Sequence, residues 1–407
     1  MFIFCILNLI ICYLKFVIRL YSYVIILNYK TFAFIIILNF KLNEQSRGKL
    51  YMKTYTSVIF WMRTIACLSI VLIHSITTTF SKMDFVGHGT AIRVFQLMLM
   101  FSTPLFVFIS EFLLAKNYHV KTKPGFFKNK LIYLGIPYII INIGIALFYF
   151  ESKTFDQFMT HLGDTMFHGG AVTYFIVIIF QFYILHILFA KYLIKWKPVP
   201  VIIGAVIFAT IYWAFRQYAP QSEHPILGLF WEREGWMLFL GWISYFLLGF
   251  YTGIYYETFM KKIKKYTWPI IIGAIIATSI LVGNYLFGIS TWVESKRFDI
   301  PFYVTMVILV FFLFASYVKY VPKSILFISN YSFCIYLIHY FFVHDLGLLR
   351  ADSSLRNIAF NFIITLTVSI CLAYIFNLSK YGKFIVGGIG HIKYDKVYES
   401  YKHGKMD

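Results

Sequence analysis

Arg63 and His74 lie in one otherwise apolar run, residues 57 to 79. A helix rises about 1.5 Å and turns about 100° per residue, so they should lie about 16 Å apart and within about 20° of one face. An arginine inside a membrane helix costs about 3 kcal/mol, and such residues normally face a protein interior or a wet cavity. Histidine can remove a proton from a hydroxyl near neutral pH. The pair therefore predicts a site that combines a base with a fixed cation.

Two structural alternatives apply to the same pair. His74 is also typical of a core histidine whose hydrogen bonds join two membrane helices. Arg63 is also compatible with an ion pair to Glu111, which is expected at a similar depth in the next apolar run.

A second polar stripe lies near the C-terminus, in the run from residue 326 to 344. Ser332, Tyr336 and His339 are spaced at i, i+4 and i+7, which places them on one helical face. Such a stripe either cross-links membrane helices by hydrogen bonds or lines a cavity. Its significance for function comes from its combination with Arg63 and His74.

Two lysines, Lys128 and Lys130, stand just ahead of Ile136-Pro137-Tyr138. As point charges at the inner membrane surface, they are suited to neutralise the phosphates of a cytoplasmic acyl donor. The alternative is that they are ordinary lysines of a cytoplasmic loop.

Aromatic residues gather at the expected entrances to two other spans. His168 and Tyr174 lie at one entrance, and Trp231, Trp236 and Trp242 flank the other. Aromatic residues at these depths are typical of interfacial anchors. The alternative is that their rings stack on the faces of sugars.

The composition predicts that all these residues are held by membrane helices. Of the 407 residues, 60% are hydrophobic and only 13% are charged. Apolar runs of about 20 residues, enough to cross a bilayer as helix, repeat along the chain. The predicted fold class is all-α, a polytopic membrane protein with about ten transmembrane helices. We expect the spans at about residues 57–79, 91–114, 131–150, 171–190, 198–216, 236–256, 268–288, 301–318, 326–344 and 357–378.

The net charge of +20 is distributed over alternate short loops. Lysine-rich loops follow the second, fourth and sixth expected spans, and such loops stay in the cytoplasm. Both ends of the ten-helix body are therefore predicted to be cytoplasmic. The lysines form no basic domain or stripe, so no nucleic-acid partner is expected. The five cysteines have neither metal-binding nor disulfide spacing, so no metal site is expected.

The chain divides into three predicted segments. Residues 1–51 form an N-terminal extension of different composition, which is either an extra membrane segment or sequence upstream of a true start at Met52. Residues 52–380 form the ten-helix domain, and residues 381–407 form a basic cytoplasmic tail.

Four motifs in order resemble the membrane acyltransferase-3 family. They are Arg63 and His74 at Arg-x10-His spacing, residues 106–110, basic residues before Ile136-Pro137-Tyr138, and residues 331–339. The resemblance extends over about residues 53–380. Within it, residues 174–182 and 241–249 are similar to the intercellular-adhesion C subgroup, which is linked to poly-N-acetylglucosamine. In two departures from the family pattern, Glu111 replaces a common glycine, and lysines replace the arginines usual before the Ile-Pro-Tyr element.

This resemblance implies an O-acyltransferase of a bacterial cell membrane. The enzyme would pass an acetyl or succinyl group from a cytoplasmic acyl-CoA-type donor to hydroxyls of an extracellular polysaccharide, without a permanently bound cofactor. His74 and Arg63 would be catalytic. The implied donor-binding or tunnel residues are Ser110, Glu111, Lys128, Lys130, Ser332, Tyr336 and His339.

The expected partners are membrane lipid, the polysaccharide and a membrane glycosyltransferase complex. Two other classes of function remain open. The first is an exporter of the polysaccharide, in which the same polar stripe lines a conduit. The second is a scaffold for the glycosyltransferase complex, in which neither Arg63 nor His74 matters individually.

Overall fold

The computed structural model describes residues 57–82, 89–149, 152–318, 320–343, 354–390 and 392. All of them belong to one compact unit, residues 54–407. The described residues form helices and connecting segments without any β-strand, which confirms the all-α class. The predicted extension, residues 1–51, and most of the predicted tail, residues 381–407, lie outside the described residues.

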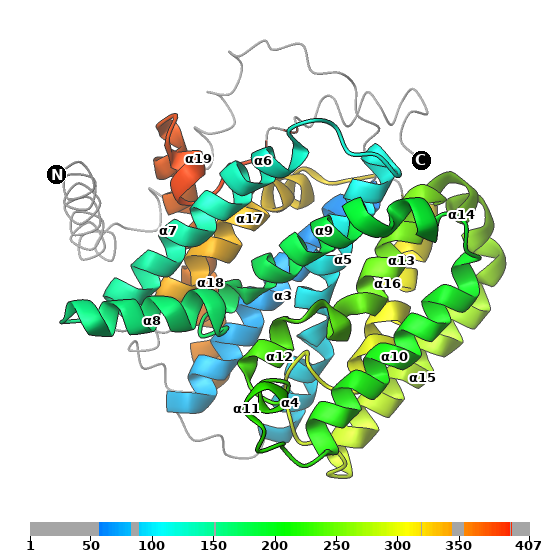
Figure 1. Ribbon diagram of the computed structural model, residues 1–407, viewed down its shortest axis with the longest axis horizontal. Helices are drawn as coiled ribbons and strands as arrows, with labels where there is room; N and C mark the ends of the chain where they lie inside the picture. Colours follow the sequence, from blue (N-terminus) through cyan, green and yellow to red (C-terminus); the bar gives the residue numbers. More distant parts are fainter. Residues whose placement is uncertain are drawn as a thin grey trace. The chain divides into compact units, whose positions relative to one another are not determined.

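The helices follow one another with few residues between them (Figure 1). Their bounds are α3 (Ser57–Lys82), α4 (Gly89–Met98), α5 (Ser102–Tyr118), α6 (Phe126–Lys130), α7 (Ile136–Gly144), α8 (Phe155–Phe167), α9 (Phe175–Leu193), α10 (Pro198–Tyr218), α11 (Pro225–Gly228), α12 (Arg233–Met237), α13 (Ile243–Ile254), α14 (Tyr256–Ile263), α15 (Thr267–Leu286), α16 (Ile300–Tyr317), α17 (Lys323–Val343), α18 (Ser354–Leu378) and α19 (Gly382–Ile385). Short 3₁₀ turns join some of them, at η1 (Leu99–Phe101), η4 (Val172–Tyr174), η5 (Phe239–Trp242) and η6 (Lys264–Tyr266), and π-helical turns occur at η2 (Leu131–Gly135) and η3 (Ile145–Tyr149).

Ten helical runs among the described residues are long and apolar enough to cross a membrane, which confirms the predicted number. The chain is therefore a multi-pass membrane protein. The runs are Ser57–Lys82, Gly89–Tyr118, Phe126–Phe148, Val172–Leu193, Pro198–Tyr218, Arg233–Ile254, Tyr256–Leu286, Ile300–Tyr317, Lys323–Val343 and Ser354–Leu378. The seventh run begins 12 residues before the predicted span because the short helix α14 precedes α15, whereas the predicted second span already included most of α4.

The helix α8, which lies between the third and fourth spans, was not predicted. The Thr154 hydroxyl accepts a hydrogen bond from the Gln157 amide, and the Gln157 side chain accepts one from the Thr154 amide. This reciprocal capping box stabilises the first turn of α8. Its signal, Thr-x-x-Gln ahead of a mixed apolar and polar stretch, was present in the sequence.

The helix that carries Arg63 and His74 lies inside the bundle. α3 packs against α5, α16, α17 and α18. The Thr64 hydroxyl donates to the Ile325 carbonyl at 2.7 Å. At the other end of α3, the Asn357 amide donates to the Thr79 hydroxyl at 3.3 Å. α3 is therefore fixed to its neighbours α17 and α18 by hydrogen bonds as well as by apolar packing.

Two glycines let α13 approach α5 closely. A Cβ atom at Gly253 would lie 2.7 Å from the Phe112 carbonyl oxygen, and one at Gly249 would lie 3.1 Å from the Cβ of Glu111. Small residues at such spacing let membrane helices pack backbone against backbone. This contact fixes the depth and rotation of the part of α5 that carries Glu111.

Candidate functional site

The structure brings two histidines of distant spans together. The ring centroids of His74 on α3 and His339 on α17 lie 5.3 Å apart, and their planes are inclined by 46°. His339 is fully buried, whereas His74 is partly buried. We call these two residues the histidine pair.

The orientation of His339 is fixed by its own helix. Its Nδ1 atom lies 2.6 Å from the Tyr336 carbonyl oxygen. A carbonyl oxygen only accepts hydrogen bonds, so Nδ1 carries the proton. In the neutral ring, the basic lone pair then resides on Nε2.

Gln96 of α4 holds the turn of α3 that contains His74. Its Nε2 atom donates to the Ile73 carbonyl at 3.1 Å and to the Thr77 hydroxyl at 2.8 Å. Gln96 is buried, and it was not among the predicted site residues. The available signal was an uncharged polar residue within an apolar helical run.

Tyr336 lies between the histidine pair and η4. Its ring centroid is 5.6 Å from that of His339 and 4.3 Å from that of Phe175. Its hydroxyl donates a hydrogen bond to the Val172 carbonyl. The predicted shared face of Tyr336 and His339 is thus present, and it joins α17 to the start of α9.

The two serines of the predicted site are bonded within their own helices. The Ser332 hydroxyl donates to the Ser329 carbonyl at 2.9 Å, and the Ser110 hydroxyl donates to the Val107 carbonyl at 2.8 Å. Neither hydroxyl is bonded to a histidine. These bonds favour a structural role for both hydroxyls.

The ion pair considered between Arg63 and Glu111 is not formed. Within the described residues, no carboxylate lies within 4.0 Å of the partly buried Arg63 guanidinium. Glu111 instead accepts a hydrogen bond from Nδ1 of His186 at 2.6 Å, and both side chains are fully buried. Burial of a carboxylate costs less free energy when an imidazole donates a hydrogen bond to it than when it has no partner.

His186 is a residue that the sequence analysis missed. The signal was a lone imidazole in the apolar run of α9. Its partner was not predictable, because Glu111 and His186 are 75 residues apart in the chain. Only the packing of α5 against α9 brings them together.

Two basic residues and a tyrosine from three helices, α3, α6 and α9, form a second group. Arg63 and Glu111 both interact electrostatically with Tyr183 of α9. The Nζ atom of Lys130 lies 5.1 Å from the centroid of the Tyr183 ring. We call Arg63, Lys130 and Tyr183 the basic cluster. Lys128, by contrast, is exposed on α6.

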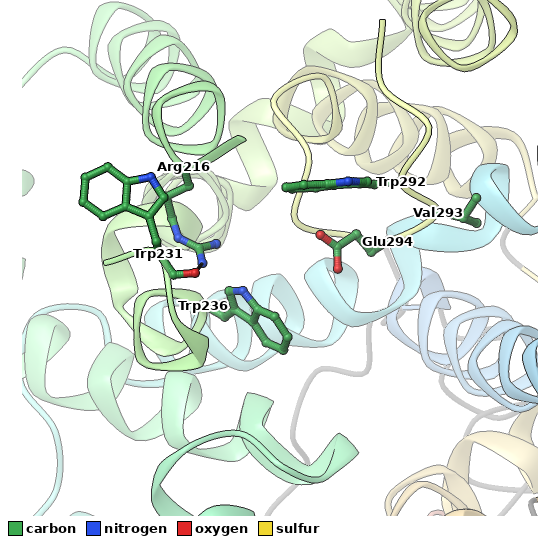
Figure 2. A pocket seen from close by; sticks show the side chains of 6 residues that line it. All are labelled: Arg216, Trp231, Trp236, Trp292, Val293 and Glu294. Carbon is green, nitrogen blue, oxygen red and sulfur yellow. Dashed lines mark hydrogen bonds between the residues drawn. The ribbon is translucent and has the colours of Figure 1, made fainter. Parts of the chain in front are cut away.

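The predicted aromatic residues separate into two groups. Trp231 and Trp236 line a cavity of about 420 Å³, together with Arg216, Trp292, Val293 and Glu294 (Figure 2). Trp242 is fully buried, and its indole N–H donates to the Trp236 carbonyl at 2.7 Å. His168 pairs with Glu234. Trp242 is therefore a structural support, whereas Trp231 and Trp236 border open space.

The described residues include no group of three or more histidine, cysteine or acidic side chains arranged to hold a metal ion. The candidate site combines imidazoles, cations and hydroxyls with the Glu111 carboxylate. This set suits proton transfer and anion binding.

The chain is similar in sequence to known membrane proteins. The sequence profile of an acyltransferase domain, that of the acyltransferase-3 family, matches residues 58–378. A protein of Bacillus subtilis (strain 168), named as a membrane-bound acyltransferase, YfiQ, is 36% identical over 83% of this chain and 96% of its own. A protein of Staphylococcus aureus (strain MRSA252), named as a poly-β-1,6-N-acetyl-D-glucosamine export protein, is 25% identical over 71% of this chain and 82% of its own. A Staphylococcus epidermidis protein of the same name is 25% identical over 71% of this chain and 81% of its own. No solved structure matches the chain.

Proposed function

Because the chain belongs to the acyltransferase-3 family of membrane proteins, we propose that it transfers an acetyl or succinyl group from a cytoplasmic acyl-CoA-type donor to a hydroxyl of an extracellular polysaccharide. The observation that carries this proposal is the histidine pair, held on the same bundle as the basic cluster. The expected acceptor is poly-N-acetylglucosamine, the polymer in the names of the staphylococcal relatives.

The basic cluster binds the donor. Arg63 and Lys130 provide positive charge, and among the described residues no carboxylate lies within ion-pair distance of Arg63. Guanidinium and ammonium groups neutralise phosphates, and they do so more effectively in a site of low dielectric constant. Lys128, which is exposed on the same helix as Lys130, contributes to the attraction of the donor at longer range.

His74 acts as the general base. It removes the proton of the acceptor hydroxyl while the hydroxyl oxygen attacks the thioester carbonyl carbon. A new C–O ester bond forms, the C–S bond breaks, and the imidazolium returns the proton to the leaving thiolate. His339, whose ring is fixed through Nδ1, positions His74 and the reacting groups.

The proposed setting is a bacterial cell membrane with both ends of the ten-helix body in the cytoplasm. Support comes from the lysine-rich loops that follow the second, fourth and sixth spans. In this orientation Arg63 lies toward the cytoplasmic end of α3 and His74 toward the outer end. No permanently bound cofactor is required, and the proposed partners are lipid, the acceptor polymer and a membrane glycosyltransferase complex.

Replacement of His74 by alanine tests the enzyme hypothesis. The acyl content of cell-surface polysaccharide, measured by NMR, should fall by at least about 100-fold, the lower contribution of a general base. His224→Ala is the matched control, because His224 is exposed on a loop. Unchanged acylation in His74→Ala cells with normal protein levels would exclude the catalytic role.

Export of the polysaccharide is the second candidate function, because the staphylococcal relatives carry that name. A deletion strain separates the two functions. Polymer trapped in the cytoplasm supports export, whereas secreted polymer without acyl groups supports the enzyme. A scaffold role predicts that neither Arg63→Ala nor His74→Ala has an effect.

A further inference from the structure

We propose that the cavity lined by Trp231, Trp236 and Trp292 is a subsite that binds a pyranose unit of the acceptor saccharide. This inference rests on the proposed function, which it deepens by assigning residues to acceptor recognition. The subsite holds a sugar near the one that reacts, so none of its residues takes part in the chemical step.

The cavity has the size and lining of a binding site. Its volume of about 420 Å³ lies within the range of about 300–1,000 Å³ typical of small-molecule pockets. Figure 2 shows the indoles of Trp292 and Trp236 on two sides, with the Glu294 carboxylate directed into the space between them. Indole faces offer flat apolar area for the C–H face of a sugar ring, and a carboxylate accepts hydrogen bonds from hydroxyls.

A guanidinium fixes one wall of the cavity. Arg216 of α10 donates to the carbonyls of Phe230, Trp231 and Glu232, the last two at 2.9 and 3.0 Å. Its Nη1 group makes no hydrogen bond to another described residue. Since Arg216 lines the cavity, this nitrogen provides a donor for a sugar hydroxyl or amide oxygen.

A second guanidinium fixes the opposite wall. Arg297 is fully buried, donates to the Trp292 carbonyl at 2.8 Å and to the Ser290 carbonyl at 3.2 Å, and pairs with Asp299. The segment that carries Trp292 and Glu294 is therefore held before any ligand binds. Preorganisation of this kind lowers the entropy cost of binding.

Charged groups of both signs lie at the cavity. The Nζ atom of Lys296 lies 3.5 Å from the centroid of the Trp236 ring and 3.3 Å from a Glu294 carboxylate oxygen. Lys296 thus balances the charge of Glu294 and covers one face of Trp236. With the Arg216 guanidinium also in the wall, the cavity offers cationic hydrogen-bond donors beside one carboxylate acceptor, and this mixture suits a carbohydrate with hydroxyl and amide groups.

The cavity lies at the end of the bundle toward which His74 is displaced. Its walls follow α10 and α15, the fifth and seventh spans, and odd-numbered spans end at the same membrane face as α3. Figure 1 shows α11 and α12 at the end of the bundle where α3 ends. In the proposed orientation this is the outer face, where the polymer would be present.

The turn η4 connects the cavity to the histidine pair. Lys296 lies 5.6 Å from the ring centroid of Tyr174, the last residue of η4. Val172, the first residue of η4, accepts the hydrogen bond of Tyr336, whose ring is 5.6 Å from His339. One short turn therefore contacts both Lys296, beside the cavity, and Tyr336, beside the histidine pair.

Calorimetric titration of the purified full chain in lipid nanodiscs tests the subsite. The probe is a β-1,6-linked N-acetylglucosamine hexasaccharide, and the variants are Trp292→Ala, Trp236→Ala and Glu294→Gln. Loss of an indole should weaken binding by about tenfold or more. Trp292→Phe, which keeps an aromatic face, should restore most of the affinity. Trp292 is 45% exposed, so its loss should leave the fold intact.

Two controls make the result specific. Trp268→Ala removes a tryptophan that is 72% exposed on α15 and does not line the cavity, so binding should be unchanged. An equal loss in this variant, or no binding to the unmodified chain, overturns the subsite. If the tryptophans served only as anchors at the membrane interface, one of these two results would be observed.

The His74→Ala variant separates failure of the subsite from failure of the enzyme hypothesis. It should bind the hexasaccharide as the unmodified chain does. If the unmodified chain binds the hexasaccharide through Trp236 and Trp292 but transfers no acyl group, the result supports the subsite and excludes the enzyme. Normal acyl transfer with an unchanged acceptor KM in both tryptophan variants overturns the subsite and supports the enzyme.

Discussion

The imidazole rings of His74 and His339 lie 5.3 Å apart, although their helices are the first and ninth described spans. Hydrogen bonds that surround the pair fix both helices. Gln96 holds α3 at Ile73 and Thr77, and the Tyr336 hydroxyl holds α17 at Val172. An arrangement held from both sides is suited to a function that needs fixed geometry, such as proton transfer.

The basic nitrogen of His339 should be needed for activity. His339→Ala and His339→Asn should each lower acyl transfer by about 100-fold or more, because neither provides an imidazole beside His74. Asparagine can still donate to the Tyr336 carbonyl, so the Asn variant should keep its melting temperature. Acyl transfer in proteoliposomes checks the rate, and an active Asn variant would show that only the hydrogen bond matters.

Arg63 should act on the donor. Arg63→Ala should raise the KM for the acyl-CoA donor by about 10- to 100-fold, the value of a charge-assisted hydrogen bond of about 1.5–3 kcal/mol. Arg63→Lys should recover part of this loss, since charge is kept and the planar fork is lost. Lys128→Ala is the matched control, because it removes an exposed cation, and it should change the KM for the donor only slightly. Equal effects in both alanine variants would contradict the assignment.

The buried Glu111 and His186 should stabilise the fold as a pair. Glu111→Leu or His186→Leu alone should cost about 3–5 kcal/mol, because the remaining group is left buried without its partner. The double variant should recover most of the loss, because no polar group then remains unpaired. Melting temperatures of the purified protein in detergent provide the measurement. Additive losses in the double variant would show that the two groups act independently.

Gly253 should be intolerant of even one added methyl group. Gly253→Ala places a Cβ 2.7 Å from the Phe112 carbonyl oxygen, so α13 and α5 must separate. Overpacking of this kind costs about 1–3 kcal/mol. Gly204→Ala on α10, where a Cβ would have no atom within 4 Å, should be neutral or stabilising by up to about 1 kcal/mol. Equal melting temperatures for the two variants would refute close packing at Gly253.

Lys296 should make stability depend on pH in the alkaline range. Burial is the main cause that lowers the pKa of Lys296 below its ordinary value of 10.5, Glu294 opposes the shift, and Arg216 and Arg233 add to it. Between the lowered pKa and 10.5, the unfolded chain binds more protons, so folding stability rises with pH and is lost as pH falls through the folded pKa. Lys296→Gln should flatten this rise in melting temperature. An unchanged pH profile in the variant would exclude Lys296 as its cause.

Sequence alone determined the fold class, because the hydrophobic effect and the need to pair every backbone polar group in lipid leave helices as the form for long apolar runs. It also placed Arg63 and His74 on one stripe, because helical periodicity is a local property. The four-residue spacing of Gly249 and Gly253 is also a local property, but it does not identify α5 as the helix that they contact.

Tertiary structure alone decided which groups meet. Glu111 pairs with His186 instead of Arg63, and Trp292 and Glu294 join Trp231 and Trp236 around one cavity. The loop that carries Trp292 has no periodicity, so its position depends on the Arg297 clamp and on the packing of α15 against α16. Contacts between residues far apart in the chain depend on how the helices pack. Many weak contacts together determine that packing, and no local sequence pattern encodes it.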